Sequence, residues 1–256
     1  MSGAVLASTP AQPMFPQVRL PFDVVTQDIN FAEALARTRE SLVRGPIDGR
    51  PLIMPDEPTA IGGLSAVYHS YFEGVGGPGG PTSAKVRVIS APLLDALTPR
   101  SIYPAEVLQG LRLLDSELQV LVHGQGHPFV PKLYAAIVDT PKNGSAPVPL
   151  GIVTEWVNGR ALTEAVQNGL LTIDEAMQAA RTVVESLARS DIRTTDPCAD
   201  NIHIEQDAAG KIIGYRVTDL NVSALGPYSQ EEIDHALVGM RDHIQQFCER
   251  CKAMKT

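Results

Sequence analysis

The chain has 256 residues, 44% of them hydrophobic, which is enough to bury a core in one large domain or two small ones. Its formal net charge of -8 argues against a protein whose main task is to grip nucleic acid, because phosphate backbones need clustered Lys and Arg. The opening residues MSGAVLASTPAQPMFPQ lack the basic start of a secretory signal peptide, and no later segment is apolar for long enough to span a bilayer.

Three cysteines are too few and too unevenly spaced for a disulfide framework, which fits a reducing compartment. Cys248 and Cys251 form a single C-x-x-C motif late in a helical pattern. A metal site would need further ligands, so we interpret this pair as surface or packing cysteines, with metal binding as the lesser alternative.

The first 57 residues indicate a tail followed by a helix. Pro, Ala and small polar residues dominate the start, so we expect a disordered tail over residues 1–29. Asn30 with Glu33 three residues later predicts a capping box that opens a helix. We therefore expect an N-terminal helix and linker over 30–57, ahead of the main domain.

The next hundred residues predict an antiparallel sheet with one helix. Residues 61–90 hold two strand-like runs around the loop GVGGPGGP, which predicts a hairpin. Leucines at helical spacing predict a long helix over 103–126. Two more strand-like runs follow at 127–140 and 148–159, on either side of the polar loop PKNGSAP.

The last part of the chain predicts two helices around a polar stretch. An acidic start and apolar residues at helical spacing predict a buried amphipathic helix over 171–191, and a final helix covers 230–252. Between them lie TTDPCADNIHI, residues 194–204, and YRVTDLN, residues 215–221. Carboxylates and a carboxamide beside strand-like runs indicate a site for a metal and phosphate.

Taken in order, these pieces resemble the protein kinase fold over roughly residues 58–225. Asp196 and Asn201 have the spacing of the kinase catalytic loop H-R-D-x-x-x-x-N, and Asp219 is similar to the metal-binding Asp of D-F-G. The resemblance implies an α+β fold: an antiparallel sheet N-lobe with helix C and hinge over 58–157, and a reduced, mainly helical C-lobe over 158–256.

The same resemblance implies roles in phosphoryl transfer from ATP. Asp196 would accept the proton of the attacking hydroxyl, while Asn201 and Asp219 would hold Mg²⁺. TSAKV resembles the kinase V-A-I-K strand, so Lys85 would contact the phosphates with Glu117 as its partner. Arg87 lies on the same face of that strand and keeps the assignment open, and Glu106 is a less well placed rival of Glu117.

Two further segments resemble nucleotide-binding parts of kinases. AIGGLSAVY is similar to the glycine-rich loop, in which glycines let backbone N–H groups approach phosphates. IVTEWVNG resembles the hinge with its gatekeeper position. The cofactor-binding residues so implied are Gly62 and Gly63 at the phosphates, Val67 over the adenine, Thr154 as gatekeeper, and the backbone of Glu155 and Val157 at the adenine edge.

The chain departs from the family pattern in several places. Thr194 and Thr195 replace the His and Arg of H-R-D, and Cys198 stands where Ser/Thr kinases usually place a phosphate-contacting Lys. Leu220 and Asn221 replace the Phe and Gly of D-F-G, and no A-P-E motif follows. These features resemble the minimal kinases among bacterial effector proteins, and imply that substrate recognition depends on other elements or on a protein partner.

We therefore expect an ATP- and Mg²⁺-dependent protein kinase, Ser/Thr in type, acting on a protein substrate with a protein partner or activator. We expect it to be soluble and cytoplasmic, or delivered into a host cell if it is an effector. Two alternatives stay open. The chain would otherwise be a pseudokinase that scaffolds a partner, or a small-molecule phosphotransferase of the aminoglycoside type.

Overall fold

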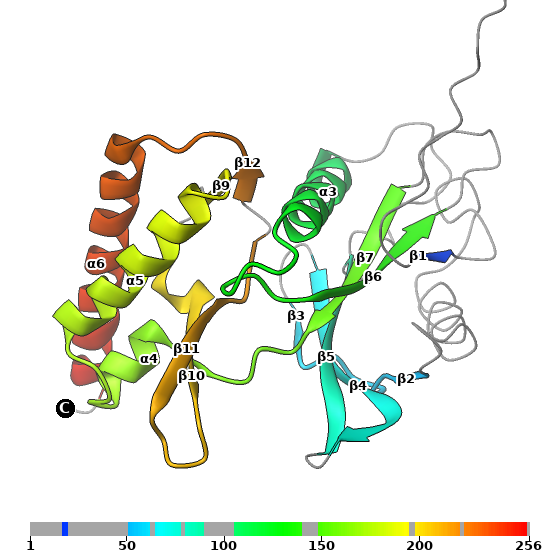
Figure 1. Ribbon diagram of the computed structural model, residues 1–256, viewed down its shortest axis with the longest axis horizontal. Coiled ribbons are helices and arrows are strands. Elements are labelled where there is room, and N and C mark those ends of the chain that lie inside the picture. The colour runs from blue at the N-terminus through cyan, green and yellow to red at the C-terminus, as the bar shows by residue number, and fades with distance from the viewer. Residues whose placement is uncertain are drawn as a thin grey trace, which may run out of the picture.

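The computed structural model describes residues 51–61, 65–77, 80–89, 105–139, 148–194, 198–220 and 223–254, together with the backbone of 17–19. They form an α+β structure in two parts that stand side by side in Figure 1. A mostly antiparallel sheet with one helix makes the first part, and three helices with short strands make the second. The predictions for the helix over 30–44, Gly62, Gly63, Thr195, Asp196 and Asn221 lie outside the described residues.

The first sheet confirms the predicted antiparallel arrangement. Its strand order is β1-β6-β7-β5-β4-β2, β3 also pairs with β4, and only the contact of β1 with β6 is parallel. The predicted hairpin is the pair β4 and β5, and the predicted long helix is α3. The elements are β1 (Gln17–Arg19), β2 (Leu52–Ile53), β3 (Ala60–Ile61), β4 (Ser65–Gly77), β5 (Gly80–Ile89), α3 (Ala105–His123), β6 (Leu133–Asp139) and β7 (Val148–Glu155).

Strand β1 differs from expectation, because it falls inside the segment for which the sequence predicts a disordered tail. Gln17–Arg19 pairs with Ala136–Val138 of β6. A strand at the edge of a sheet offers a row of unpaired backbone groups, and a short extended segment from elsewhere in the chain can satisfy them. Composition alone does not reveal such pairing.

The side chains of strand β5 point alternately to two faces of the sheet, one that lies toward the core and one that carries the charged residues Lys85 and Arg87. Ala84, Val86 and Val88 are buried in the apolar core of the sheet. Because successive side chains of a strand point to opposite faces, Lys85 and Arg87 share the other face, opposite the core residues. That face is where helix α3 and the second part of the molecule meet the sheet.

The second part confirms the two predicted helices and the two strand-like runs, and adds a short helix, α4, and three short strands, β8, β9 and β12, that the sequence did not predict. Helices α5 and α6 pack on each other through small and aliphatic side chains, among them Ala176, Ala180 and Val183. Strands β10 and β11 form a hairpin, β8 extends it, and β9 pairs with β12. The elements are β8 (Arg160–Ala161), α4 (Leu162–Gln167), α5 (Ile173–Ala188), β9 (Ile192–Thr194), the 3-10 turn η1 (Ala199–Asn201), β10 (Ile202–Gln206), β11 (Ile212–Val217), β12 (Ser223–Leu225) and α6 (Gln230–Ala253).

Both long helices of the second part begin with a capping box. The Thr172 hydroxyl accepts from the Glu175 backbone N–H, and the Glu175 carboxylate accepts from the Thr172 N–H. Ser229 and Glu232 repeat the pattern at the start of α6. These contacts satisfy backbone donors that a helix leaves unpaired, and they fix where each helix starts.

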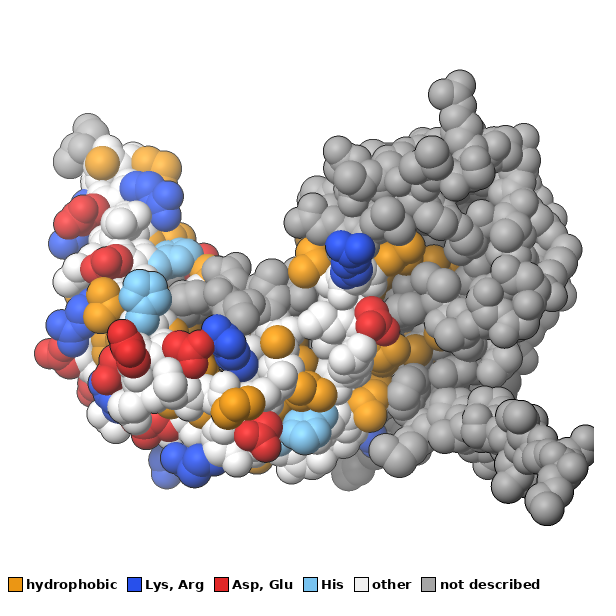
Figure 2. Space-filling model, turned by 90° about the horizontal axis from the view of Figure 1, so that it is seen from above, with side chains coloured by type: hydrophobic (Ala, Val, Ile, Leu, Met, Phe, Trp, Pro, Cys, Tyr) orange, Lys and Arg blue, Asp and Glu red, His pale blue; other side chains and the backbone are white. Residues whose placement is uncertain are grey.

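The sequence argues against two features, a basic surface for nucleic acid and a segment that spans a membrane, and the structure can be compared with both. Figure 2 shows acidic and basic side chains interspersed over the helical part of the face it presents, rather than one basic patch. Within the part of the chain that the structure describes, no helix combines the length and the apolar character that crossing a membrane requires.

Candidate functional site

Four charged side chains meet where the two parts of the molecule face each other. Arg87 Nη1 lies 2.9 Å from Glu117 Oε2 of α3 and 3.0 Å from Asp219 Oδ1, just after β11. Lys85 Nζ donates a hydrogen bond of 2.7 Å to the carbonyl oxygen of Thr218. We call Lys85, Arg87, Glu117 and Asp219 the ion cluster. It joins the sheet, helix α3 and the second part at one point.

Burial sets the electrostatics of the ion cluster. Burial raises the pKa of Glu117, whose carboxylate is almost fully enclosed, while the nearby cations of Arg87 and Lys85 oppose this shift. Burial lowers the pKa of Lys85, against the attraction of Glu117. Burial also works to lower the pKa of Arg87, but the carboxylates of Glu117 and Asp219 outweigh it and raise that pKa. The guanidinium is therefore the permanent charge of the cluster.

The predicted pairing of Lys85 with Glu117 needs correction, because the ion pair to Glu117 comes from Arg87. The guanidinium reaches three partners at once: its Nε donates to Ser65 Oγ at 2.9 Å, and its Nη1 donates to Glu117 and Asp219. A rigid fork of donors suits such a buried convergence better than the single ammonium group of Lys85. The sequence placed both cations on this face and left the choice between them open.

Asn201 and Asp219 come together as the sequence predicts, although they are far apart in the chain. Asn201 ends the turn η1 and Asp219 follows β11, and the register of β10 with β11 places these ends side by side. The Thr218 N–H donates to the Asn201 carbonyl at 2.8 Å, and Asn201 and Asp219 are both among the residues around one narrow, mostly apolar cavity. Amide and carboxylate oxygens are the donor set that Mg²⁺ prefers, so these residues fit that ion.

The adenine-binding residues that the sequence predicts lie in part beside the ion cluster. Thr154 is buried and pairs in register with Lys85, while Val67 pairs with Arg87, so both border the cluster on the same face. Glu155 ends β7 and Val157 lies in the connection to β8.

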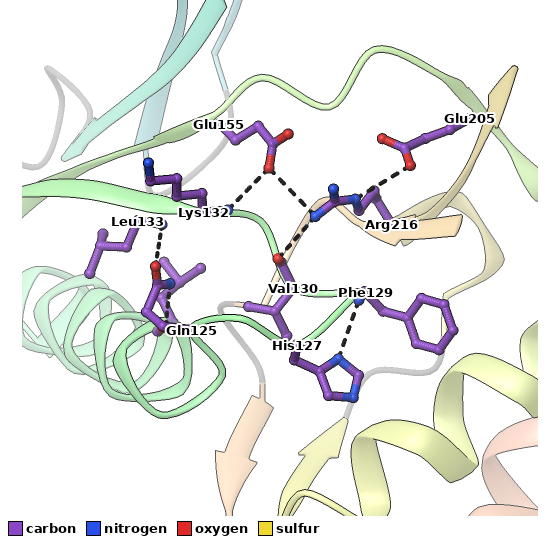
Figure 3. Close-up of polar contacts among 10 residues, drawn as sticks. Gln125, His127, Phe129, Val130, Lys132, Leu133, Glu155, Glu205 and Arg216 are labelled. Atoms are coloured by element: carbon purple, nitrogen blue, oxygen red, sulfur yellow. Dashed lines mark hydrogen bonds and ion pairs between the residues drawn. The ribbon is translucent and has the colours of Figure 1, made fainter. Parts of the chain in front are cut away.

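Figure 3 shows the Glu155 side chain directed at Lys132 and Arg216, whereas the resemblance assigns only the backbone of Glu155 to the adenine edge. Its carboxylate accepts from the Lys132 N–H at 3.2 Å and lies 3.5 Å from Arg216 Nη1. Arg216 in turn donates to the Val130 carbonyl and pairs with Glu205. We call Glu155, Arg216 and Val130 the hinge anchor, because they fasten the end of β7 to β11.

Two residues with notable contacts in this region were not predicted from the sequence. Trp156 stacks on His69 of β4 with ring centroids 3.8 Å apart, which seals the connection against the sheet. His203 of β10 is partly buried, and burial lowers its pKa. Both residues lie inside segments that the sequence singles out, IVTEWVNG and TTDPCADNIHI, but the resemblance assigns neither of them a role. Asp196 lies outside the described residues, so its role stays a prediction.

Comparison with models of known protein families gave no match, and neither did comparison with curated protein sequences.

Proposed function

We propose that the chain is an ATP- and Mg²⁺-dependent phosphotransferase of the protein kinase type, with a minimal C-lobe and a protein substrate. The observation that carries the proposal is the ion cluster: a buried Arg87 is held by Glu117 and contacts Asp219, and the residue before Asp219 is hydrogen-bonded to the Asn201 backbone. Phosphoryl transfer depends mostly on positioning and on neutralising charge, and this cluster supplies both kinds of group.

Each residue has a distinct task in this proposal. Arg87, fixed by Glu117, presents a permanent positive charge to the phosphates of the nucleotide. Asn201 and Asp219 supply the oxygen atoms for Mg²⁺, whose charge would neutralise the phosphate oxygens during transfer. Asp196 orients the substrate hydroxyl and takes up its proton, as a general base must. Lys85 stays close to the Thr218 carbonyl and adds a second positive charge at the floor of the site.

Helix α6 is the element that we propose for substrate contact. A cavity of about 340 Å³ opens between β9 and α6, and Thr194 and Glu231 are among its lining residues. Thr194 precedes the proposed base Asp196 by two positions in the sequence, which is why we assign substrate contact to this cavity. Glu232 is already paired with Arg193 and with the cap of α6, so Glu231 is the carboxylate of this helix start that we propose to contact a basic residue of the substrate.

A pseudokinase is the second candidate, and one contact favours it. Arg87 engages an oxygen of Asp219 that a metal would also use, so the site has an internal partner for that carboxylate. In this case the fold would bind a partner, with or without nucleotide, and transfer no phosphate. The aminoglycoside type of phosphotransferase stays a prediction that no contact favours.

Thermal unfolding with ATP, in the presence and absence of Mg²⁺, tests the proposal first. A ligand that binds only the folded state stabilises it by about 2.7 kcal/mol at a hundredfold excess over Kd. We expect a magnesium-dependent rise in Tm that Asp219→Ala removes and the exposed control Asp234→Ala keeps. Transfer of labelled phosphate to a protein acceptor then separates the two candidates, and a rise in Tm without any transfer favours the pseudokinase.

A further inference from the structure

Three side chains of different chemistry converge outside the ion cluster. Cys198 Sγ lies 3.3 Å from His243 Nδ1, and His243 Nε2 lies 3.2 Å from Asp200 Oδ2. Each residue offers one sulfur, nitrogen or oxygen atom such that these three atoms lie within 4.8 Å of one another. We call Cys198, Asp200 and His243 the sulfur cluster. Among the residues that the structure describes, no other group of three or more His, Cys, Asp or Glu side chains meets this distance.

The fold holds the sulfur cluster from two sides. Cys198 and Asp200 sit on the tight turn η1, which the hydrogen bond from Asn201 N–H to the Cys198 carbonyl closes at 3.0 Å. His243 comes from α6, which packs against this turn and against α4. The two halves of the cluster are thus brought together by tertiary packing between elements that are some 40 residues apart in sequence.

A buried hydroxyl orients the carboxylate of the cluster. Thr163 of α4 is fully buried, and its Oγ1 donates to Asp200 Oδ1, which leaves Oδ2 directed at His243. Outer partners of this kind are common around metal ligands, because they fix the direction in which a ligand oxygen points. The His243 and Asp200 side chains remain 27% and 44% exposed, so an ion can reach them from solvent.

We propose that Cys198, Asp200 and His243 form a three-ligand binding site for Zn²⁺. Thiolate, imidazole and carboxylate are the ligand types of zinc, whereas Mg²⁺ takes oxygen ligands. Tetrahedral coordination at zinc bond lengths puts ligand atoms roughly 3.4 to 3.6 Å apart. The pairs Cys198 Sγ with His243 Nδ1, at 3.3 Å, and Asp200 Oδ2 with His243 Nε2, at 3.2 Å, are slightly closer than this. One ion takes one imidazole nitrogen, and Thr163 holds Asp200 on the Nε2 side of the ring, so we expect Nε2 to bind the ion and the Cys198 side chain to rotate toward it.

Three protein ligands leave the fourth zinc position for water or another small ligand. Cys198 lines the same narrow cavity as Asn201 and Asp219, so bound zinc would lie close to the proposed phosphotransferase site. The zinc proposal does not depend on that function, since it rests on the ligand atoms alone. Because thiolate is a soft ligand that favours Zn²⁺ over Mg²⁺, we expect Zn²⁺ at Cys198 and Mg²⁺ at the oxygen atoms of Asn201 and Asp219.

Zinc affinity of the full chain tests the proposal directly. After removal of metal by dialysis against a chelator, Zn²⁺ is titrated in competition with a chromophoric chelator, and Co²⁺ is titrated separately while its absorption is recorded. We expect one equivalent of either ion and a thiolate-to-cobalt absorption band. Cys198→Ala and His243→Gln should each weaken zinc binding at least tenfold, and Cys198→Ala should remove the band. Thr163→Val should weaken binding about 10- to 100-fold, as loss of an outer partner typically does.

The matched controls change a cysteine and a histidine of α6, the helix that carries His243. Cys251→Ser and His235→Gln should leave zinc affinity unchanged. Circular dichroism checks the fold of each variant, and Cys198→Ser replaces Cys198→Ala if the alanine variant unfolds. Absence of zinc binding at micromolar concentration in the unmodified chain overturns the proposal, and so does zinc binding that survives both ligand changes. Rapid alkylation of Cys198 without any metal binding would also overturn it, and would leave a thiol–imidazole pair only.

Discussion

Replacing Arg87 tests which of two cations, Arg87 or Lys85, pairs with Glu117. Arg87 is that partner in the structure, whereas the kinase resemblance implies Lys85. Arg87→Met removes the guanidinium and leaves Glu117, which is 3% exposed, without its ion-pair partner at 2.9 Å. Breaking one side of a buried ion pair costs about 3–5 kcal/mol, because the remaining charge stays buried. We expect a loss of that size in the free energy of unfolding.

The double variant Arg87→Met with Glu117→Met removes both buried charges and fills their volume with apolar groups. Replacing a whole buried pair in this way is often neutral or stabilising. The double variant should therefore be more stable than Arg87→Met alone, with a coupling energy of about 2–3 kcal/mol between the two sites. Urea unfolding, followed by fluorescence of the single tryptophan and by circular dichroism, gives these values.

Nucleotide binding provides the second measurement on the same variants. Arg87→Met should abolish the magnesium-dependent rise in Tm with ATP, whereas Lys85→Met should reduce it. Arg87→Lys should be less stable than the unmodified chain, because one ammonium group cannot replace the three contacts of the guanidinium, but more stable than Arg87→Met, because it keeps a positive charge beside Glu117. If Lys85→Met removed the effect of ATP and Arg87→Met left it intact, our assignment of the phosphate-facing cation would be wrong.

Three further changes test other parts of the structure. In Gly151→Ala, the added Cβ would lie 2.6 Å from the Arg87 backbone carbonyl, so β7 must shift away from β5; we expect about 1–3 kcal/mol of destabilisation in urea, and an unchanged midpoint would contradict the strand pairing. Thr172→Ala removes the capping box of α5 and should cost about 1 kcal/mol, seen as a lower Tm, whereas Thr182→Ala inside that helix serves as the control. Burial lowers the pKa of His203, so the folded state binds fewer protons than the unfolded one just below the ordinary pKa of about 6.5; stability should fall as pH drops through that value, and His203→Leu should flatten this slope in urea titrations at pH 5.5 to 7.5.

Much of the fold was predictable because its signals are local. The helices α3, α5 and α6 each show apolar residues at helical spacing, and α5 and α6 also carry capping residues at their starts. The strands β4 to β7 alternate or form apolar runs between turn residues. The short strands β8, β9 and β12 span two or three residues each, too few for any periodic pattern.

The candidate site was predictable in its residue types but not in its contacts. The order of motifs selected Asn201 and Asp219, and the register of β10 with β11 does bring them together. Which cation reaches Glu117 depends on how far α3 lies from β5, a distance that no spacing in the sequence encodes. The same limit applies to His243, since only packing of α6 against η1 brings it to Cys198.

The hinge anchor has a consequence for how the two parts of the molecule can move. The Val217 N–H donates to the Phe129 carbonyl, and His123 contacts the Ser190 carbonyl, so these links flank the pair of Glu155 with Arg216. Asp219 lies only two residues after Val217, so the ion pair of Arg87 with Asp219 is a further tie between the two parts beside these bonds. Any movement that separates the parts along this segment has to break a partly buried ion pair as well as backbone hydrogen bonds.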